Sequence, residues 1–479
     1  MGGRSDRRRP SSTRFLSGTS ACALLLSSLG GAAVAQPAPS GPAAHLSLAE
    51  ALDYASANYP SVKAALEQKT AADRDVDVAR AAYLPQVNLL YQINRSTVNN
   101  ITGVLLPQAV IPSISGPVLA DNSHSAWNSG AGVLATWRPF DFGYRAAKVD
   151  AAREAASAAG QSVALTRLDV LTATSNAYMN LAAAQSLATV AQANVDRLHA
   201  VSAASHVLVD NKLRAGVEAE QADAAEALAR TTLLGARNNV EQQRATLAKL
   251  VGRPGAALAI DDAPLLDSPP PQGPPQGPAG LESHPSALGE AARVRQQSAQ
   301  LRALDRSYAP QFDLVGSASE RGGGKTTAGD YRGGDAGLSP DVGNWSVGVQ
   351  VTVPLGAYPS LAAQQSAQRA RVRAERDRYD QTLGDLAEQL TQGQASLNSA
   401  EEIAKITPVA LKAARTSEAQ QRVRYQSGLA TVVDVTAAEA ALAQAESQDA
   451  IARLNVWRAL AALAAARGDM SPLRAAAPK

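Results

Sequence analysis

Four short stretches of the chain alternate apolar and polar residues, as β-strands do. In the clearest of them, Trp345, Val347, Val349 and Val351 alternate with small or polar residues. A period of two places the apolar side chains on one face of a strand and the polar ones on the other. The sequence therefore predicts strands with one apolar and one polar face, at about residues 85–97, 126–138, 311–319 and 345–353.

The residues around these strands have the longer period of helices. We expect a helix over about residues 46–82 before the first strand pair, and long helices over about residues 144–213 and 361–424 after each pair. At about 1.5 Å per residue, the first long helix would be on the order of 100 Å in length. Leucines and small residues recur in steps of three and four from Leu383 to Ala400, which predicts a coiled-coil seam in the second long helix.

The succession of a helix, a β-hairpin, a long helix and a returning helix occurs twice. The motif YLPQVNL at residues 83–89 returns as YAPQFDL at residues 308–314, and Pro60 returns as Pro285 at the same spacing of 225. A repeat of this length predicts one body built from two similar halves. The expected segments are a signal peptide (1–35), a first structural repeat (36–251), a Pro-rich linker (252–284), a second structural repeat (285–470) and a C-terminal tail (471–479).

The first 35 residues have the features of a secretory signal peptide. Arginines precede an apolar stretch over residues 15–29, and Ala33 and Ala35 form a small-residue cleavage site. Cys22, the one cysteine, lies in this leader in a poor lipidation motif, so we expect it to leave with the leader. Removal of residues 1–35 takes away five Arg and one Asp and leaves 40 basic and 42 acidic side chains. The resulting charge of −2 does not favour nucleic acid as a partner.

The apolar faces of the predicted strands indicate a membrane. Each face is about ten residues long, which suits a strand that crosses a bilayer. Four strands are too few to close a barrel, and an open sheet edge is not tolerated in lipid. Several copies must therefore combine their strands, and three copies would give twelve. The expected fold class is mixed α and transmembrane β, a trimeric channel with a 12-stranded β-barrel on an α-helical barrel.

At this point the sequence resembles the TolC-like outer membrane efflux protein family, the outer membrane factors of tripartite pumps. The resemblance covers nearly all of the mature chain. It is carried by the duplicated order, the Y-x-P-Q motif before each hairpin, and the turn sequences LRAGV (213–217) and YQSGL (425–429). It implies a homotrimer with its barrel in the outer-membrane lipid of a Gram-negative cell and a helical tunnel through the periplasm. It also implies two partners, a periplasmic adaptor (a membrane fusion protein) and an inner-membrane transporter.

The resemblance assigns a role to each turn. In the family, these turns lie at the periplasmic tip and contact the adaptor, which implicates Gly216 and Val217 in the first half and Gly428 and Leu429 in the second. In this interpretation Gly216 ends the first long helix and is the counterpart of Gly428.

The resemblance also implies a periplasmic gate beside the turns. Tyr425, three residues before Gly428, and Asp434, six residues after it, match gating positions, and Asp223 comes seven residues after Gly216. Simpler interpretations remain open for each of them. The two aspartates lie near helix starts, where the helix dipole favours a carboxylate, and Tyr425 is compatible with plain helix packing.

The expected gate departs from the family pattern at two positions. Ala430 and Ala437 stand where the best-known member carries Arg and Asp. We therefore expect a closed state that is locked less firmly or by other residues. Glu220 would supply a further carboxylate at the tip.

No set of residues predicts catalysis, a cofactor or a metal site. The segment RGGGKT (321–326) lacks the first glycine and the following helix of a phosphate-binding loop, so we interpret it as a surface loop. His199 and His206 lie two turns apart on one helical face, but no third ligand is near, and we interpret them as solvated or packed. No Ser/His/Asp set or carboxylate pair can be placed in one pocket, so we expect no enzyme.

The leading hypothesis is a passive exit duct in the outer membrane, through which a tripartite efflux system exports small molecules. The exit duct of a type I protein secretion system has the same fold and is the alternative. A periplasmic coiled-coil scaffold is a third hypothesis, although a scaffold would not need four strands with apolar faces.

Overall fold

A computed structural model describes residues 45–97, 125–256, 258–260, 265, 280–324 and 332–476. All of these residues belong to one compact unit that spans residues 41–479. The expected signal peptide with Cys22, most of the Pro-rich linker and the end of the RGGGKT segment lie outside the described residues.

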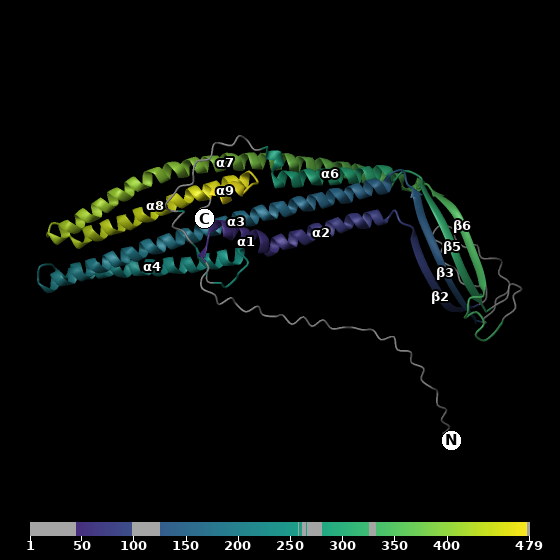
Figure 1. Cartoon of the computed structure of the whole chain (residues 1–479), viewed down its shortest axis with the longest axis horizontal. Helices are drawn as coiled ribbons and strands as arrows, with labels where there is room; N and C mark the ends of the chain where they lie inside the picture. The colour runs from purple at the N-terminus through teal and green to yellow at the C-terminus, as the bar shows by residue number, and fades with distance from the viewer. Residues whose placement is uncertain are drawn as a thin grey trace, which may run out of the picture. The chain divides into compact units, whose positions relative to one another are not determined.

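The two halves of the chain have matching helices (Figure 1). The returning helices are equal in length at 35 residues each, and the long helices have 67 and 69 residues. The order expected from the sequence is therefore present twice. The first half contains α1 (Leu48–Asn58), α2 (Pro60–Ala81), α3 (Tyr144–Asp210) and α4 (Gly216–Leu250). The second contains α6 (Pro285–Arg306), α7 (Tyr358–Gln426), α8 (Val432–Ala466) and the short α9 (Ser471–Ala476).

The expectation of one helix over residues 46–82 is wrong, because the helix breaks before Pro60. Tyr59 has an extended backbone (φ −65°, ψ 131°) and separates α1 from α2. Proline lacks an N–H group and disfavours helical geometry in the residue before it. His284, before Pro285, has nearly the same backbone angles (φ −64°, ψ 138°). The same proline effect therefore starts α2 and α6.

The four predicted strands form one antiparallel sheet in the order β2-β3-β5-β6. Both hairpins are present, and β3 pairs with β5, so the sheet joins the two halves of the chain. The bounds differ from expectation mainly in β3, which continues past Pro139 through an irregular pairing, and in β5, which is longer. The strands are β2 (Gln86–Thr97), β3 (Ser125–Phe140), β5 (Gln311–Gly323) and β6 (Val342–Thr352).

The apolar face of the sheet is not covered by other parts of the described chain. Leu89 in β2 and Trp345 in β6 are both 81% exposed, and Val347 and Val349 are exposed beside Trp345. An apolar surface of this kind is unfavourable in water and marks a contact with lipid or another protein. Figure 1 shows the strands beyond the ends of α2 and α3, away from the helical turns.

The core of the helical part includes segments that the sequence did not predict. The two-residue strand β1 (His45–Leu46) pairs in parallel with β4 (Ala259–Ile260). Strand β4 lies within the segment expected as a linker. Leu265, from the same segment, is buried in the main hydrophobic cluster, and its carbonyl accepts a hydrogen bond from Trp457 Nε1 at 3.2 Å. The chain between the two repeats is thus partly packed into the core.

The small-residue seam expected in the second long helix is present. Gly393 of α7 lies against Leu463 of α8, where an added Cβ atom would come within 3.5 Å of the Leu463 Cα atom. Leu397 and Ala400 are buried in the same α7–α8 cluster. The seam therefore lets the two helices approach closely along their length.

Charged residues recur along both long helices. Among the residues that the structure describes, no helix combines enough length and apolar character to cross a bilayer.

Candidate functional site

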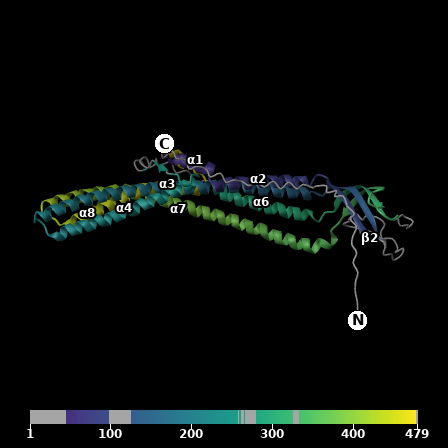
Figure 2. The ribbon, with the colours of Figure 1, turned by 90° about the horizontal axis from the view of Figure 1, so that it is seen from below.

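The α3–α4 and α7–α8 turns lie together at the end of the helices away from the sheet (Figure 1 and Figure 2). A small hydrophobic cluster beneath them contains residues from four helices (α3, α4, α7 and α8) and the second turn. Its members are Val201, Ala222, Tyr425, Ala430, Val432 and Val435. The structure therefore brings the two turn sequences into one site.

The first turn is not built around Gly216, and this expectation is wrong. Gly428 has a left-handed backbone (φ 79°), and the next residue, Leu429, donates its N–H to the Arg424 carbonyl at 2.8 Å. The residue with that conformation in the first turn is Lys212 (φ 61°). Glycine accepts this geometry at no steric cost, whereas a lysine adopts it at a cost of about 1–2 kcal/mol. Gly216 instead begins α4.

This geometry changes which residues of the two halves correspond. With Lys212 matched to Gly428, Arg214 corresponds to Ala430. Asp434 is the third residue of α8, and the third residue of α4 is Glu218. Asp223 is therefore not the counterpart of Asp434, which corrects the expected pairing of the two aspartates.

Arg214 crosses from the first turn to the second. Its Nη2 donates a hydrogen bond to the carbonyl of Ala430 at 3.1 Å, and its guanidinium group lies 5.3 Å from the centre of the Tyr425 ring. Nη1 is 3.4 Å from a carboxylate oxygen of Glu218, and the Arg214 and Glu218 side chains are only 18% and 14% exposed. The sequence analysis missed Arg214. Matching the turns by their left-handed residues would have placed it at the position of Ala430.

Tyr425 is buried and holds α7 against α3. Its side chain is 4% exposed, and its hydroxyl oxygen lies 2.8 Å from Ser205 Oγ. Ser205 donates its own hydroxyl hydrogen to the Val201 carbonyl at 2.9 Å. Since a serine hydroxyl has one hydrogen, Tyr425 donates and Ser205 accepts. Tyr425 is thus part of the packing and also makes a specific polar contact between the two halves.

Asp434 caps the start of α8. One carboxylate oxygen accepts hydrogen bonds of 2.8 Å from the Thr431 N–H and from the Thr431 hydroxyl, and the Asp434 N–H donates back to Thr431 Oγ1. These bonds form a capping box. The backbone bond from Thr431, followed by its hydroxyl, lowers the pKa of Asp434 below its usual range. The interpretation of Asp434 as a residue that stabilises a helix start therefore fits, and its carboxylate is still exposed.

Asp223 lies farther along α4 and binds to α3. Ser202 Oγ donates to it at 2.6 Å, and His206 Nε2 lies 2.9 Å from its second oxygen. The hydrogen bond to Asp223 raises the pKa of His206, and the bonds from Ser202 and His206 lower the pKa of Asp223. A second histidine of α3, His199, places its Nδ1 atom 3.1 Å from Glu226 Oε1 of α4. The described residues contain no group of three or more metal-ligating side chains.

The residues expected to contact an adaptor are accessible at the tip. Val217 and Leu429 are exposed, as are both Gly216 and Gly428. Glu220 is also exposed, and its charge adds to the electrostatic effect that raises the pKa of His206. The tip therefore presents apolar side chains together with the exposed carboxylate of Glu220.

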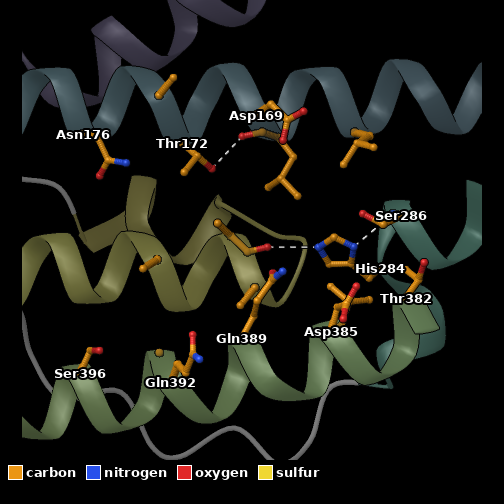
Figure 3. A pocket seen from close by; sticks show the side chains of 18 residues that line it. Asp169, Thr172, Asn176, His284, Ser286, Thr382, Asp385, Gln389, Gln392 and Ser396 are labelled. Atoms are coloured by element: carbon orange, nitrogen blue, oxygen red, sulfur yellow. Dashed lines mark hydrogen bonds between the residues drawn. The ribbon is translucent and has the colours of Figure 1, made fainter. Parts of the chain in front are cut away.

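A cavity of about 870 Å³ lies between α3, α7 and the end of α8 (Figure 3). Polar and apolar side chains both line it, and His284 is the buried titratable group in it. His284 Nδ1 accepts a hydrogen bond from the Ser286 N–H, so Nε2 carries the proton and donates to the Ala465 carbonyl at 3.2 Å. Burial lowers the pKa of His284. Because both ring nitrogens are occupied, this imidazole is not placed to act as a base on a substrate.

Comparison with known proteins agrees with this architecture. A family model described as outer membrane efflux protein matches residues 51–253 and 279–469. No curated protein matches the chain.

Solved structures of outer-membrane channels have the same fold. VceC from Vibrio cholerae is 20% identical, covers 88% of this chain and 96% of its own, and has a TM-score of 0.71. The CmeC outer membrane channel of Campylobacter jejuni is 14% identical over 88% of this chain and 85% of its own, with a TM-score of 0.70. The open state of the MtrE channel of Neisseria gonorrhoeae is 18% identical over 88% and 89%, with a TM-score of 0.70.

Proposed function

Because the chain belongs to the outer membrane efflux protein family, and is therefore an outer-membrane protein that extends into the periplasm, we propose that it is the exit duct of a tripartite efflux system. In this role it exports small molecules that an inner-membrane transporter and a periplasmic adaptor deliver. The observation that carries the proposal is that one chain contains both a lipid-compatible sheet and very long helices. An open sheet with an exposed apolar face is joined to helices of up to 69 residues.

The functional unit in this proposal is a homotrimer. The outer strands β2 and β6 each pair on one side only within the described chain. An unpaired strand edge is not tolerated in lipid, so β2 of one copy would pair with β6 of the next and close a barrel of twelve strands. The long helices would form the duct below it.

Closure of the duct in this proposal takes place where the two turns meet. Tyr425 and Arg214 hold the second turn against the first. The carboxylates of Asp434, Asp223 and Glu220 would line the closed end of the duct. Rings of carboxylates attract cations and exclude anions. Arg214 would replace the arginine that the best-known family member carries at the position of Ala430.

The tip would also contact the adaptor. Val217 and Leu429 are apolar side chains exposed at the turns, beside Gly216 and Gly428. Exposed apolar residues surrounded by polar ones are typical of protein–protein contacts. The adaptor would therefore bind close enough to the Arg214–Tyr425 contact to affect the closed state.

The proposal is tested by the size and the conductance of the purified protein. In mild detergent, native mass spectrometry should detect a trimer, and the same preparation should form cation-selective pores in planar lipid bilayers. A stable monomer that keeps its strand content would contradict the architecture. A trimer that never conducts, with or without the adaptor, would contradict the role as a duct.

A further inference from the structure

Two buried glutamates face each other between the helices of the second repeat. Glu439 of α8 is 1% exposed and Glu418 of α7 is 4% exposed, and Glu418 is close enough to contribute to the raised pKa of Glu439. Glu439 Oε2 and Glu418 Oε1 each lie 2.7 Å from an arginine nitrogen, but neither contact has the geometry of a hydrogen bond. Ionised carboxylates only accept hydrogen bonds, so the two groups can bond to each other only when one of them is protonated.

A cation from the first repeat completes the pair. Arg197 of α3 places its Nε atom 2.7 Å from Glu439 Oε2, and its side chain is mostly buried. The three side chains come from α3, α7 and α8, so the cluster lies where the two halves of the chain meet. Of the two glutamates, only Glu439 is in an ion pair with Arg197.

The cluster holds three arginines and three glutamates, but only Arg197 among the arginines is mostly buried. Arg197 also contacts Glu446 of α8 at 3.3 Å, and Arg415 of α7 contacts the same glutamate at 3.7 Å. Arg422 of α7 pairs with Glu418 at 2.7 Å, but it is about half exposed to solvent. Although α4 also touches α8, the described part of α4 places no charged group within ion-pair distance of Glu439.

We propose that Glu418 and Glu439 together bind one proton, and that this proton holds α7 and α8 against α3 in the closed conformation. The proton site itself does not depend on the proposed function as a duct. Its consequence for opening rests on the proposed function as a duct. Glu418 lies seven residues before Tyr425 on α7, which places both side chains on one face of the helix, two turns apart. A change at the carboxyl pair therefore acts on the helix that carries the contact to Ser205.

The effect of pH follows from the burial of Glu439. Burial, together with the neighbouring Glu418, raises the pKa of Glu439 from 4.5 to about 7. A carboxyl group whose pKa is raised in the packed state favours that state while it is protonated. The stabilisation is fully present below about pH 4.5 and is lost as the pH rises through about 7. Above that, two charged glutamates repel each other in a buried site.

Hydrogen–deuterium exchange of the full-length protein in detergent tests this proposal, with mass spectrometry of the peptides over residues 411–445. After correction for the intrinsic pH dependence of exchange, wild-type protein should exchange at least about tenfold faster at pH 8 than at pH 6, since one unit of pKa difference is a tenfold change in equilibrium. Glu439→Gln, a neutral mimic of the protonated acid, should stay protected at both pH values. Glu402→Gln, which removes an exposed carboxylate of α7, should behave as wild type.

Two results would overturn the proposal. One is equal corrected exchange of the wild type at the two pH values. The other is a Glu439→Gln variant that folds and keeps the full pH dependence. If Glu439→Gln does not fold, Glu418→Gln replaces it, because a neutral partner removes the repulsion in the same way. A protein that forms no pore would contradict the proposed duct but leave this exchange result intact, so the two failures are distinguishable.

Discussion

The hydroxyl groups of Ser205 and Tyr425 lie 2.8 Å apart, although 220 residues separate them along the chain. This contact joins α3 of the first repeat to α7 of the second, close to both turns. Arg214 lies on the same tyrosine ring and binds the second turn. The two halves are thus connected at the tip by one buried hydroxyl and one guanidinium group, and each can be removed by a single substitution.

Tyr425→Phe should raise single-channel conductance in planar bilayers. The change removes a buried neutral hydrogen bond, which is worth about 0.5–1.5 kcal/mol, and threefold symmetry would apply the loss three times. Ser205→Ala should have a similar effect, and the double variant should add little to either, because both changes remove the same contact. Fully additive effects would show that the two hydroxyl groups act separately.

Arg214→Ala should open the tip further than Tyr425→Phe. The arginine makes a charged hydrogen bond to the second turn and also packs on the tyrosine ring. Loss of such a bond costs about 1–3 kcal/mol. The expected result is a higher conductance and a lower melting temperature. Arg376→Ala, which removes an exposed arginine from α7 far from the turns, is the control and should leave conductance unchanged.

Asp434→Ala should mainly weaken cation selectivity and the block by divalent cations. The substitution also breaks the capping box, so a loss of stability alone could be mistaken for a loss of charge. Thr431→Ala breaks the same box and keeps the carboxylate, which makes it the matched control. Reversal potentials in a salt gradient should change for Asp434→Ala and stay near wild type for Thr431→Ala. Equal shifts would assign the effect to the cap.

The His206–Asp223 ion pair between α3 and α4 should weaken at both high and low pH. Because the pKa of His206 is raised above 6.5, its contribution is present below that value and lost as the pH rises through the raised pKa. Because the pKa of Asp223 is lowered below 3.8, its contribution is present above that value and lost as the pH falls through the lowered pKa. The ion pair should persist between these limits.

The Asp223→Asn variant tests this ion pair. Deuterium incorporation at the imidazole C2 position, followed by mass spectrometry, reports the pKa of each histidine. In Asp223→Asn the pKa of His206 should fall toward its ordinary value. Asp196→Asn, elsewhere on α3, should leave it unchanged. An unaltered pKa of His206 in Asp223→Asn would contradict the importance of this pair.

Val349→Arg should impair insertion into the outer membrane, whereas Gln350→Arg should be tolerated. Val349 is exposed on the apolar face of β6, and a cation on the lipid face near the middle of the bilayer costs roughly 2–4 kcal/mol. Gln350 follows it on the opposite face and donates to Thr352 Oγ1 at 3.3 Å. Membrane fractionation of the two variants measures the difference. Equal damage from both would mean that the faces of the strand are assigned incorrectly.

The sequence predicted most of the fold because local rules determine it. Alternation in residues 345–353 predicts a strand without knowledge of its partners. The break before Pro60 follows from an equally local rule, but the sequence analysis continued one helix through it. The first turn was placed wrongly because glycine was taken as the marker of left-handed geometry, and Lys212 adopts that geometry instead.

The contacts of the candidate site were less accessible to sequence analysis. Arg214 and Ala430 are 216 residues apart, and the Glu418–Glu439 pair depends on how α7 and α8 are rotated against each other. Helical periodicity predicts which residues share a face, but not which helix that face meets. Tyr425 was found by resemblance, while its partner Ser205 has no distinguishing motif.

The strand order also determines when each hairpin can pair during synthesis and export of the chain. Because β3 pairs with β5, the first hairpin gains its neighbour only after α3, α4 and α6 have been synthesised and exported. Such distant pairing forms slowly, and exposed apolar strands aggregate while they wait. In a newly translocated chain, the first hairpin is therefore exposed to water, without its neighbouring strand, until β5 has been exported. We therefore expect its maturation to need a chaperone that shields residues 86–97 and 125–140 until the second hairpin has been exported.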